Sequence, residues 1–298
     1  MNNDRVLWLD GQLVPERDAR ASLMEHGLHY GTGVFEGIRC YETADGAAVF
    51  RLDEHLARME QGAEVLGMRL DRAQLKEAVK RVLQANAHQE AYIRPLAFYG
   101  AGSLGLDVGP ELPSHVVVAT MPWSSHLGDA AKRDGIRVKR TAVRRVSARA
   151  LPPLKLCGTY VNSVIAKRSA TREGFDEALF VDDLGCVCEA TGENVFMVKN
   201  GQVTAVRHAD ALPGITRQTV IELTHAQDRP VTFAELLDAD EVFLTGTSAE
   251  VTPVRQLDEI VKAVGPVTRQ VQQLYERAVR GQLKGLEGWL TRVQSWAA

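Results

Sequence analysis

The sequence predicts an α+β protein built from two domains. Apolar residues recur at helical spacing in residues 53–66, and after residue 177 short apolar runs separated by turn residues predict antiparallel strands. The 298 residues also exceed the roughly 100 to 150 residues of a usual single domain. A linker-like stretch that holds two large rings lies at residues 122–128. We therefore expect an N-terminal domain at residues 1–121, an interdomain loop at 122–131 and a C-terminal domain at 132–298.

The first domain is expected to open with a hairpin and to continue through a glycine-rich line. Asp10-Gly11, between residues 6–9 and 12–15, is a strong signal for a two-residue turn. Residues 29–41 alternate small and large side chains around three glycines. Glycines inside a strand mark a bulge or a place where a ligand approaches the backbone. A strained strand edge without a ligand is an equal alternative here.

Two helices are predicted next. Residues 53–66 carry an apolar stripe, with Asp53 placed to cap the helix and Gly67 to end it. Residues 75–83 predict the second helix. Arg58 borders the first stripe, where it is either a solvated surface residue or a clamp for an anion.

Residues 91–99 and 115–121 predict strands. Tyr92 and Arg94 are two positions apart on the first of them, so both side chains should lie on one face.

The loop between these strands contains a G-x-G-x-x-G pattern at residues 100–105. A dinucleotide site needs these glycines to open a helix that points at the pyrophosphate. The prolines and glycine that follow, at positions 109, 110 and 113, forbid a helix. We therefore reject dinucleotide binding and expect a mobile surface loop.

The second domain should contain mostly strands. In chain order the expected elements are a strand at 135–146, a helix at 160–172 capped by Gly174, a meander of antiparallel strands at 178–181, 186–189, 195–198 and 203–206, a helix reaching residue 226, a short helix after a capping box at Thr232 and Glu235, a strand at 241–244 and a helix at 267–279.

Composition excludes several classes of function. Apolar residues make up 45% and charged residues 24% of the chain, which is typical of a globular protein. A net charge of −3 without a basic run argues against nucleic acid as a partner. The four cysteines lack zinc-like spacing, so we expect no metal. No export segment and no run of about 18 apolar residues is present, and we expect a cytoplasmic protein without a membrane partner.

Lys155 is the candidate catalytic residue. It lies between Leu154 and Leu156, after two prolines that stiffen the chain. Partial burial in apolar surroundings disfavours the ammonium form and makes a lysine nucleophilic. The alternative is a side chain whose stem covers apolar surface while its head stays in water.

Three other features would suit the chemistry of this lysine. The start of a helix at Gly214-Ile215-Thr216 offers free N–H groups to an anion such as phosphate, and residues 245–248 offer a second set of donors. Glu189 ends a strand, where its carboxylate could face inward. Each feature alone is more often a solvated carboxylate or an ordinary turn. Together with a tyrosine they suit pyridoxal 5'-phosphate, whose aldehyde, phosphate and pyridine nitrogen need these partners.

Five stretches, at residues 29–39, 91–95, 189–194, 212–217 and 246–255, closely resemble the branched-chain aminotransferases. These enzymes belong to the class IV, fold type IV pyridoxal-phosphate enzymes. The resemblance implies a smaller N-terminal α/β domain and a larger C-terminal pseudo-barrel domain of mainly antiparallel strands with helices. It also implies a homodimer or higher homo-oligomer, in which the loop at 100–109 reaches toward the neighbouring subunit's site.

The resemblance also assigns roles to single residues. Lys155 would form the imine with the cofactor and move the proton, Glu189 would contact the pyridine nitrogen, and Tyr160 would bond to the phenolic oxygen. Leu212 would pack on the ring. The residues implied to hold the phosphate are Arg58, Gly214, Ile215, Thr216, Gly246 and Thr247. Those implied to bind the substrate are Tyr30, Phe35, Gly37, Tyr92, Arg94, Trp123, His126, Thr247 and Ser248.

The implied activity is transamination between an L-amino acid with a branched apolar side chain and 2-oxoglutarate. Two positions depart from the family pattern, because His126 stands where bacterial members have tyrosine and Thr159 where they have asparagine. His126 leaves the preferred amino acid open. The alternatives of the same fold are a D-amino-acid transaminase, an amine transaminase and an aminodeoxychorismate lyase. A remote alternative is a non-catalytic binding or scaffold protein.

Overall fold

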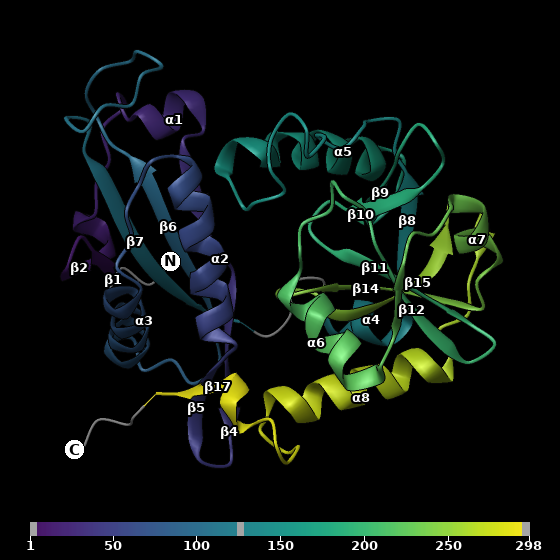
Figure 1. Cartoon of the computed structure of the whole chain (residues 1–298). Helices are drawn as coiled ribbons and strands as arrows, with labels where there is room; N and C mark the ends of the chain where they lie inside the picture. Colours follow the sequence, from purple (N-terminus) through teal and green to yellow (C-terminus); the bar gives the residue numbers. More distant parts are fainter. Residues whose placement is uncertain (1–4, 124–127, 294–298) are drawn as a thin grey trace. The chain divides into compact units, whose positions relative to one another are not determined.

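The structure is a computed structural model that describes residues 5–123 and 128–293. Its contacts divide the chain into two compact units (Figure 1). Unit 1 contains residues 1–124, 154–158 and 279–298, and unit 2 contains residues 125–153 and 159–278. The short segment that carries Lys155 therefore belongs to unit 1, although most of its neighbours in sequence belong to unit 2.

The described part of unit 1 is built on an eight-stranded sheet. Its strand order is β17-β5-β4-β6-β7-β1-β2, with β3 paired to β6, and the pairings between the described strands are antiparallel. The strands are β1 (Val6–Leu9), β2 (Gln12–Pro15), β3 (Gly33–Phe35), β4 (Ile38–Thr43), β5 (Gly46–Phe50), β6 (Ala91–Tyr99), β7 (Ser114–Pro122) and β17 (Leu290–Arg292). The expected hairpin at Asp10-Gly11 is confirmed as the turn between β1 and β2.

Two long helices pack on this sheet, α2 (Leu52–Val65) and α3 (Arg72–Ala85) (Figure 1). Leu56 of α2 and Val79 of α3 join Ile93 of β6 in one buried apolar cluster, as their helical spacing predicts. The expected cap at Asp53 is wrong. Arg51 occupies the N-cap position. Asp53 lies in the first helical turn, where its negative charge interacts favourably with the positive end of the helix dipole.

The glycine-rich line at residues 29–41 is not one strand. His29 and Tyr30 end the short helix α1 (His26–Tyr30), and Gly31 then reverses the chain with a φ of 67° before β3. After β6, the described residues 100–113 contain no helix and run through bends and a turn to β7. The expectation that no helix follows these glycines is therefore confirmed.

The described part of unit 2 is built on a nine-stranded sheet with the order β10-β9-β8-β15-β14-β11-β12-β13, and β16 pairs with β15. The strands are β8 (Ile136–Arg140), β9 (Glu177–Val181), β10 (Val187–Ala190), β11 (Asn194–Lys199), β12 (Gln202–Val206), β13 (Gln227–Arg229), β14 (Glu241–Gly246), β15 (Glu250–Leu257) and β16 (Ile260–Val261). The pairings of β8 with β9 and β15, and of β12 with β13, are parallel.

Two expectations for this sheet need correction. The hairpins β9-β10 and β11-β12 form as predicted, but β8, β15 and β14 lie between them, so the four strands are not one meander. The strand expected at residues 135–146 ends at Arg140. Both errors concern partners that are distant in sequence, which local patterns do not specify.

The helices of unit 2 are α4 (Gly128–Asp134), α5 (Tyr160–Arg172), α6 (Ile215–Thr224), α7 (Phe233–Asp238) and α8 (Pro266–Val279), the last residue of which counts with unit 1. The capping box of Thr232 and Glu235 is confirmed at the start of α7. Ala166 and Ala170 of α5 pack in one buried cluster with Phe180 of β9. The small alanines let α5 lie close to the sheet.

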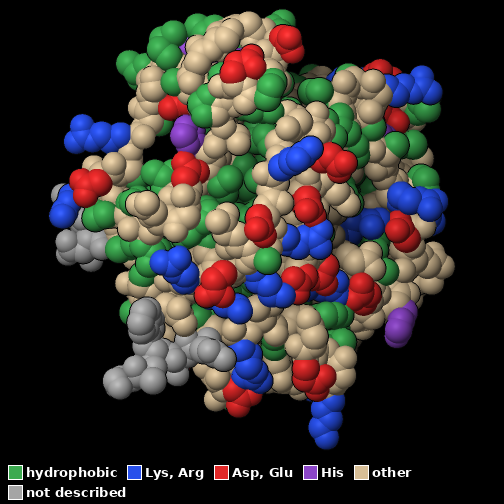
Figure 2. All heavy atoms as spheres, turned by 60° about the vertical axis from the view of Figure 1, so that its left-hand side comes forward, with side chains coloured by type: hydrophobic (Ala, Val, Ile, Leu, Met, Phe, Trp, Pro, Cys, Tyr) green, Lys and Arg blue, Asp and Glu red, His purple; other side chains and the backbone are tan. Residues whose placement is uncertain are grey.

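The surface of the protein carries charges of both signs. On the face drawn in Figure 2, lysine and arginine side chains alternate with aspartate and glutamate side chains. That face offers no extended basic patch for a polyanion. Within residues 5–123 and 128–293, no helix combines the length and the apolar character needed to cross a membrane.

Candidate active site

The segment that carries Lys155 lies alongside the glycine-rich residues that lead into β3. The Gly158 N–H donates to the Gly31 carbonyl at 3.1 Å, and the Phe35 N–H donates to the Lys155 carbonyl at 3.2 Å. Val34 and Leu156 form an antiparallel bridge between these bonds. A methyl group on Gly31 would lie 2.7 Å from the Gly158 Cα atom. Gly31 therefore allows the backbone of the Lys155 segment to lie directly against the residues before β3.

The Lys155 side chain is half-buried and lies over an aromatic ring. Its Nζ atom is 4.9 Å from the ring centroid of Phe35, a distance at which the face of the ring attracts an ammonium group. The Arg94 guanidinium lies 4.8 Å from the centroid of the same ring. Leu156, the next residue, is buried in the core with Val34 and Met59. The backbone is thus anchored in apolar surroundings, while the Lys155 residue as a whole is half-buried.

Tyr92 and Arg94 lie on one face of β6, as their spacing predicts. Arg94 Nη2 donates to the Tyr92 hydroxyl at 2.7 Å, and the Tyr92 ring lies 5.0 Å from that of Trp123. A methyl group on Gly37 would lie 2.0 Å from the Tyr92 hydroxyl oxygen, so any larger residue there would displace the Tyr92 side chain. Unit 1 therefore brings five of the predicted substrate residues into one group of contacts, Phe35, Gly37, Tyr92, Arg94 and Trp123.

Tyr30, another predicted substrate residue, lies outside this group of contacts. The Tyr30 hydroxyl donates to the Leu104 carbonyl at 2.8 Å, and His26 Nε2 lies 3.0 Å from the Gly105 carbonyl. Helix α1 thus holds the loop that contains the rejected dinucleotide pattern. His126 lies outside the described residues.

Arg58 belongs to a buried charged cluster that sequence reasoning missed. Its Nε and Nη2 atoms donate to the two carboxylate oxygens of Glu36 at 2.7 and 2.9 Å, and His55 Nδ1 lies 2.8 Å from the same carboxylate. Glu36 is fully buried. Burial alone would raise the pKa of Glu36, but Arg58 and His55 hold it well below its usual range. Burial lowers the pKa of His55, so this ring is neutral near pH 7.

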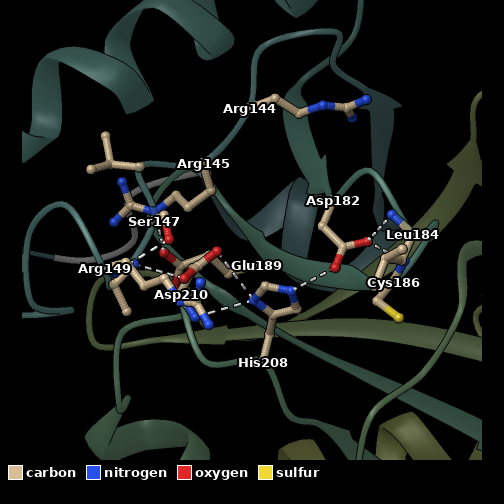
Figure 3. A network of polar contacts seen from close by, with 12 residues as sticks. Arg144, Arg145, Ser147, Arg149, Asp182, Leu184, Cys186, Glu189, His208 and Asp210 are labelled. Atoms are coloured by element: carbon tan, nitrogen blue, oxygen red, sulfur yellow. Dashed lines mark hydrogen bonds and ion pairs between the residues drawn. The ribbon is translucent and has the colours of Figure 1, made fainter.

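In unit 2 the carboxylate of Glu189 is buried and held from both sides (Figure 3). Arg145 Nε donates to one oxygen at 2.7 Å, and the Leu212 N–H donates to the other at 2.9 Å. Arg145 Nη1 also donates to Asn162 Oδ1 of α5 at 3.2 Å. The inward-facing carboxylate was predicted, but its arginine partner was not.

A polar network holds the loop that carries Arg145 (Figure 3). The Ala148 N–H donates to Asp210 Oδ1 at 2.7 Å, and the Asp210 N–H donates to His208 Nδ1 at 3.1 Å. His208 Nε2 lies 3.2 Å from Asp182 Oδ2, to which it donates because Nδ1 is an acceptor. The network fixes the loop at Ala148, three residues after Arg145, while the arginine itself is held by Glu189 and Asn162.

The start of α6 in unit 2 is the predicted anion site. Gly214 is its N-cap in an extended conformation, and no described side chain caps the helix. Asn194 Nδ2 donates to the Leu212 carbonyl at 2.9 Å, and a methyl group on Gly214 would lie 1.9 Å from Asn194 Oδ1. Ile215 and Thr216 are buried in the first turn, where backbone N–H groups have no partner within the helix. The sequence did not point to Asn194, which sets the approach to this helix.

The other predicted phosphate residues of unit 2 lie at the turn between β14 and β15. Gly246 ends β14, and Thr247 and Ser248 follow, half-buried, in the turn. Thr245 is opposite Asn194 in the pairing of β11 and β14, so the two side chains share a face of the sheet. Among the described residues the buried Thr245 hydroxyl has no hydrogen-bond partner. An unpaired hydroxyl on the face of Asn194 fits a polar ligand at this place.

The sequence of this chain is similar to those of known aminotransferases. A sequence model of the family described as "Amino-transferase class IV" matches residues 33–257. The chain belongs to the class IV aminotransferases. A branched-chain-amino-acid aminotransferase from Pseudomonas aeruginosa is 37% identical and covers 98% of this chain and 99% of its own, and one from Escherichia coli is 36% identical over 96% and 97%.

Solved structures agree with this class IV assignment. The Escherichia coli branched-chain amino acid aminotransferase is 35% identical with a TM-score of 0.94, covering 98% of this chain and 100% of its own. The enzyme from Thermobaculum terrenum, solved in its PLP form, is 31% identical with a TM-score of 0.90, over 99% and 100%. The enzyme from Thermoproteus uzoniensis, solved with norvaline, is 34% identical with a TM-score of 0.91, over 97% and 99%. The predicted α+β fold of this class is confirmed.

Gly31→Ala is expected to lower the rate of this aminotransferase by roughly 10²-fold, because a displacement of about 1 Å at a catalytic group has that effect. The added methyl group would push Gly158, and with it the backbone of Lys155. Gly11→Ala is the matched control. Gly11 also has a positive φ, but no described atom lies within 4 Å of a methyl group there. Equal steady-state rates for the two variants would contradict the expected role of Gly31.

Proposed function

We propose that this chain is a pyridoxal 5'-phosphate-dependent transaminase that exchanges the amino group between L-leucine, L-isoleucine or L-valine and 2-oxoglutarate. The observation that carries the substrate class is the group around Lys155 in unit 1. Phe35, Tyr92 and Trp123 provide apolar and aromatic walls, and Arg94 adds one cation among them. Such a pocket accepts a branched apolar side chain and can also pair with the distal carboxylate of glutamate.

The residues present fit the cofactor. The cofactor supplies the electron sink that stabilises negative charge at the α-carbon of the substrate. The Lys155 amine would bond to its aldehyde and then move the proton to and from that carbon. Glu189, kept opposite the Arg145 guanidinium, would accept a hydrogen bond from the protonated pyridine nitrogen. The buried Thr245 hydroxyl and the close fit of Gly214 against Asn194 favour a bound polar group beside α6.

Other predicted residues would bind the phosphate, the ring and the phenolic oxygen of the cofactor, and the carboxylate of the substrate. The N–H groups of Ile215 and Thr216, with those of Gly246 and Thr247, would hold the phosphate. Leu212 would pack on the ring, since its backbone is fixed by bonds to Glu189 and Asn194. Arg58 would add positive charge, Tyr160 at the start of α5 would bond to the phenolic oxygen, and Ser248 would help to bind the substrate carboxylate.

A second copy of this chain is the proposed partner. Leu23, Leu28 and Leu106 are 81%, 66% and 80% exposed in unit 1, and Tyr30 beside them is 46% exposed. So many large apolar side chains are rarely left in water on a monomer. We therefore propose a homodimer in which this surface is covered.

The four cysteines, all described, form no disulfide, which favours the proposed cytoplasmic location.

A panel of amino donors with 2-oxoglutarate tests the proposal. We expect the highest kcat/KM with L-leucine, L-isoleucine and L-valine, lower values with L-phenylalanine, and no turnover with D-amino acids or simple amines. Activity confined to D-donors would overturn the substrate class, and a colourless protein that takes up no added pyridoxal 5'-phosphate would overturn the cofactor. A His126→Tyr variant in the same panel measures how residue 126 affects the preference among donors.

A further inference from the structure

A second pair of carboxyl groups is buried in unit 2, apart from Glu189. Glu177 of β9 and Glu193, in the loop between β10 and β11, are 2% and 7% exposed. The Glu177 carboxylate accepts hydrogen bonds from the Ala178 N–H at 2.7 Å and from the Thr191 hydroxyl, and it forms an ion pair with Lys167 of α5. Together with the Thr191 N–H at 3.4 Å, these donors, one of them an ammonium group, stabilise a negative charge on Glu177.

Glu193 faces this charge directly. Its carboxyl group interacts with that of Glu177, and its Oε2 atom accepts a hydrogen bond from the Gly192 N–H at 3.2 Å. Two buried carboxyl groups in contact cannot both be ionised without a large cost in free energy. Burial and the charge of Glu177 raise the pKa of Glu193 to about 8, although Lys167 acts in the opposite direction. Glu193 therefore carries the proton of this pair at neutral pH.

The protonated carboxyl group supports the turn after β14. A methyl group on Gly246 would lie 3.2 Å from Glu193 Cγ and 3.2 Å from the Gly192 carbonyl, so the end of β14 rests on this loop. Gly246 and Thr247 are the residues to which the phosphate is assigned. A negative charge on Glu193 would thus appear close to a bound dianion. Besides Glu177 of β9, Lys167 of α5 is a charged side chain that acts on Glu193.

We propose that Glu193 is a positioning residue that holds the shared proton of the Glu177–Glu193 pair, and that loss of this proton weakens binding of the cofactor phosphate at the Gly246–Thr247 turn. The inference rests on the proposed cofactor. Linkage makes the effect reciprocal, because a bound phosphate also makes the proton of Glu193 harder to remove. When Glu193 is protonated, the net charge of Lys167, Glu177 and Glu193 together is zero. Without the proton, a net negative charge lies under the turn.

The dissociation constant of pyridoxamine 5'-phosphate, measured on the full chain between pH 6.5 and 9.5, tests the proposal. This probe has no aldehyde and cannot bond to Lys155, so the amine chemistry does not contribute. We expect the affinity of the wild type to fall about 10-fold across this range, within the usual size of coupling between two sites. Glu193→Gln keeps a hydrogen-bond donor but cannot ionise, so its affinity should be nearly independent of pH. Glu64→Gln, which alters an exposed carboxyl group of α2, should follow the wild type.

Two further readouts separate this role from simple support of the turn. Lys167→Gln removes the cation that lowers the pKa of Glu193, so the midpoint of the affinity loss should move to higher pH.

The second readout is thermal stability. Folding raises the pKa of Glu193 from 4.5 to about 8, so the contribution of Glu193 to stability is complete below pH 4.5 and is progressively lost as the pH rises from 4.5 to about 8. The melting temperature of the cofactor-free wild type should therefore fall relative to that of Glu193→Gln over this interval.

The outcomes are distinguishable from those of the proposed function. Parallel pH curves for the wild type and Glu193→Gln, with both proteins binding the probe, would overturn this inference and leave the transaminase intact. An absence of binding by both proteins at every pH would overturn the assigned cofactor and this inference together. A flat curve for Glu193→Gln beside a falling one for the wild type supports both.

Discussion

Lys155→Ala is expected to lower the transamination rate by at least about 10³-fold, because it removes both the amine that bonds to the cofactor and the group that moves the proton. The fold should persist. The bonds that fix this segment join Lys155 and Gly158 to β3 and its approach through backbone atoms, and substitution of the side chain leaves them in place. The half-buried amine contributes no hydrophobic core that alanine would remove.

The measurement is the steady-state rate with L-leucine and 2-oxoglutarate, together with the binding of pyridoxamine 5'-phosphate and a far-ultraviolet dichroism spectrum. Lys284→Ala, at an exposed position of unit 1, is the control and should match the wild type. Retained binding of the probe with lost turnover would assign the chemistry to Lys155. Normal turnover by Lys155→Ala would refute the mechanism.

The parts of the fold that the sequence predicts well are those that depend on near neighbours. The Asp10-Gly11 hairpin, the capping box before α7 and the apolar stripe of α2 all arise from residues a few positions apart. Strand β6 was also placed correctly, and its alternation brought Tyr92 and Arg94 to one face. Patterns of this length are determined by the geometry of a single helix, strand or turn.

The parts that sequence reasoning missed depend on contacts between distant positions. Arg145 and Glu189 are 44 positions apart, and Asn194 meets Leu212 across 18. The glycines before β3 indicate that something lies close to this backbone. The sequence does not show that the partner is the segment of Lys155, which is distant along the chain. A single sequence marks each partner as polar or small. It does not say which of the many distant polar residues will meet.

Glu36 is the clearest such case, and Glu36→Gln is expected to lower the free energy of unfolding by about 3 to 5 kcal/mol, because it leaves the buried Arg58 guanidinium without its counter-charge. A matched control exists in the same unit. Arg5 and Glu16 form a similar two-bond pair at 2.8 and 2.9 Å, but their side chains are 31% and 41% exposed. Glu16→Gln should therefore cost less than about 1 kcal/mol. Urea unfolding of both variants gives the comparison, and equal losses would contradict the role of burial.

The same cluster predicts how stability depends on pH. Folding lowers the pKa of His55 below 6.5, so proton uptake favours the unfolded chain and stability falls as the pH drops below 6.5. Folding also lowers the pKa of Glu36 below 4.5, so its contribution is complete above pH 4.5 and is lost as the pH falls further. Glu36→Gln has no carboxylate to protonate. Below pH 4.5 the stability of the wild type should therefore fall more steeply than that of Glu36→Gln, and identical slopes would show that Glu36 is not ionised in the folded protein.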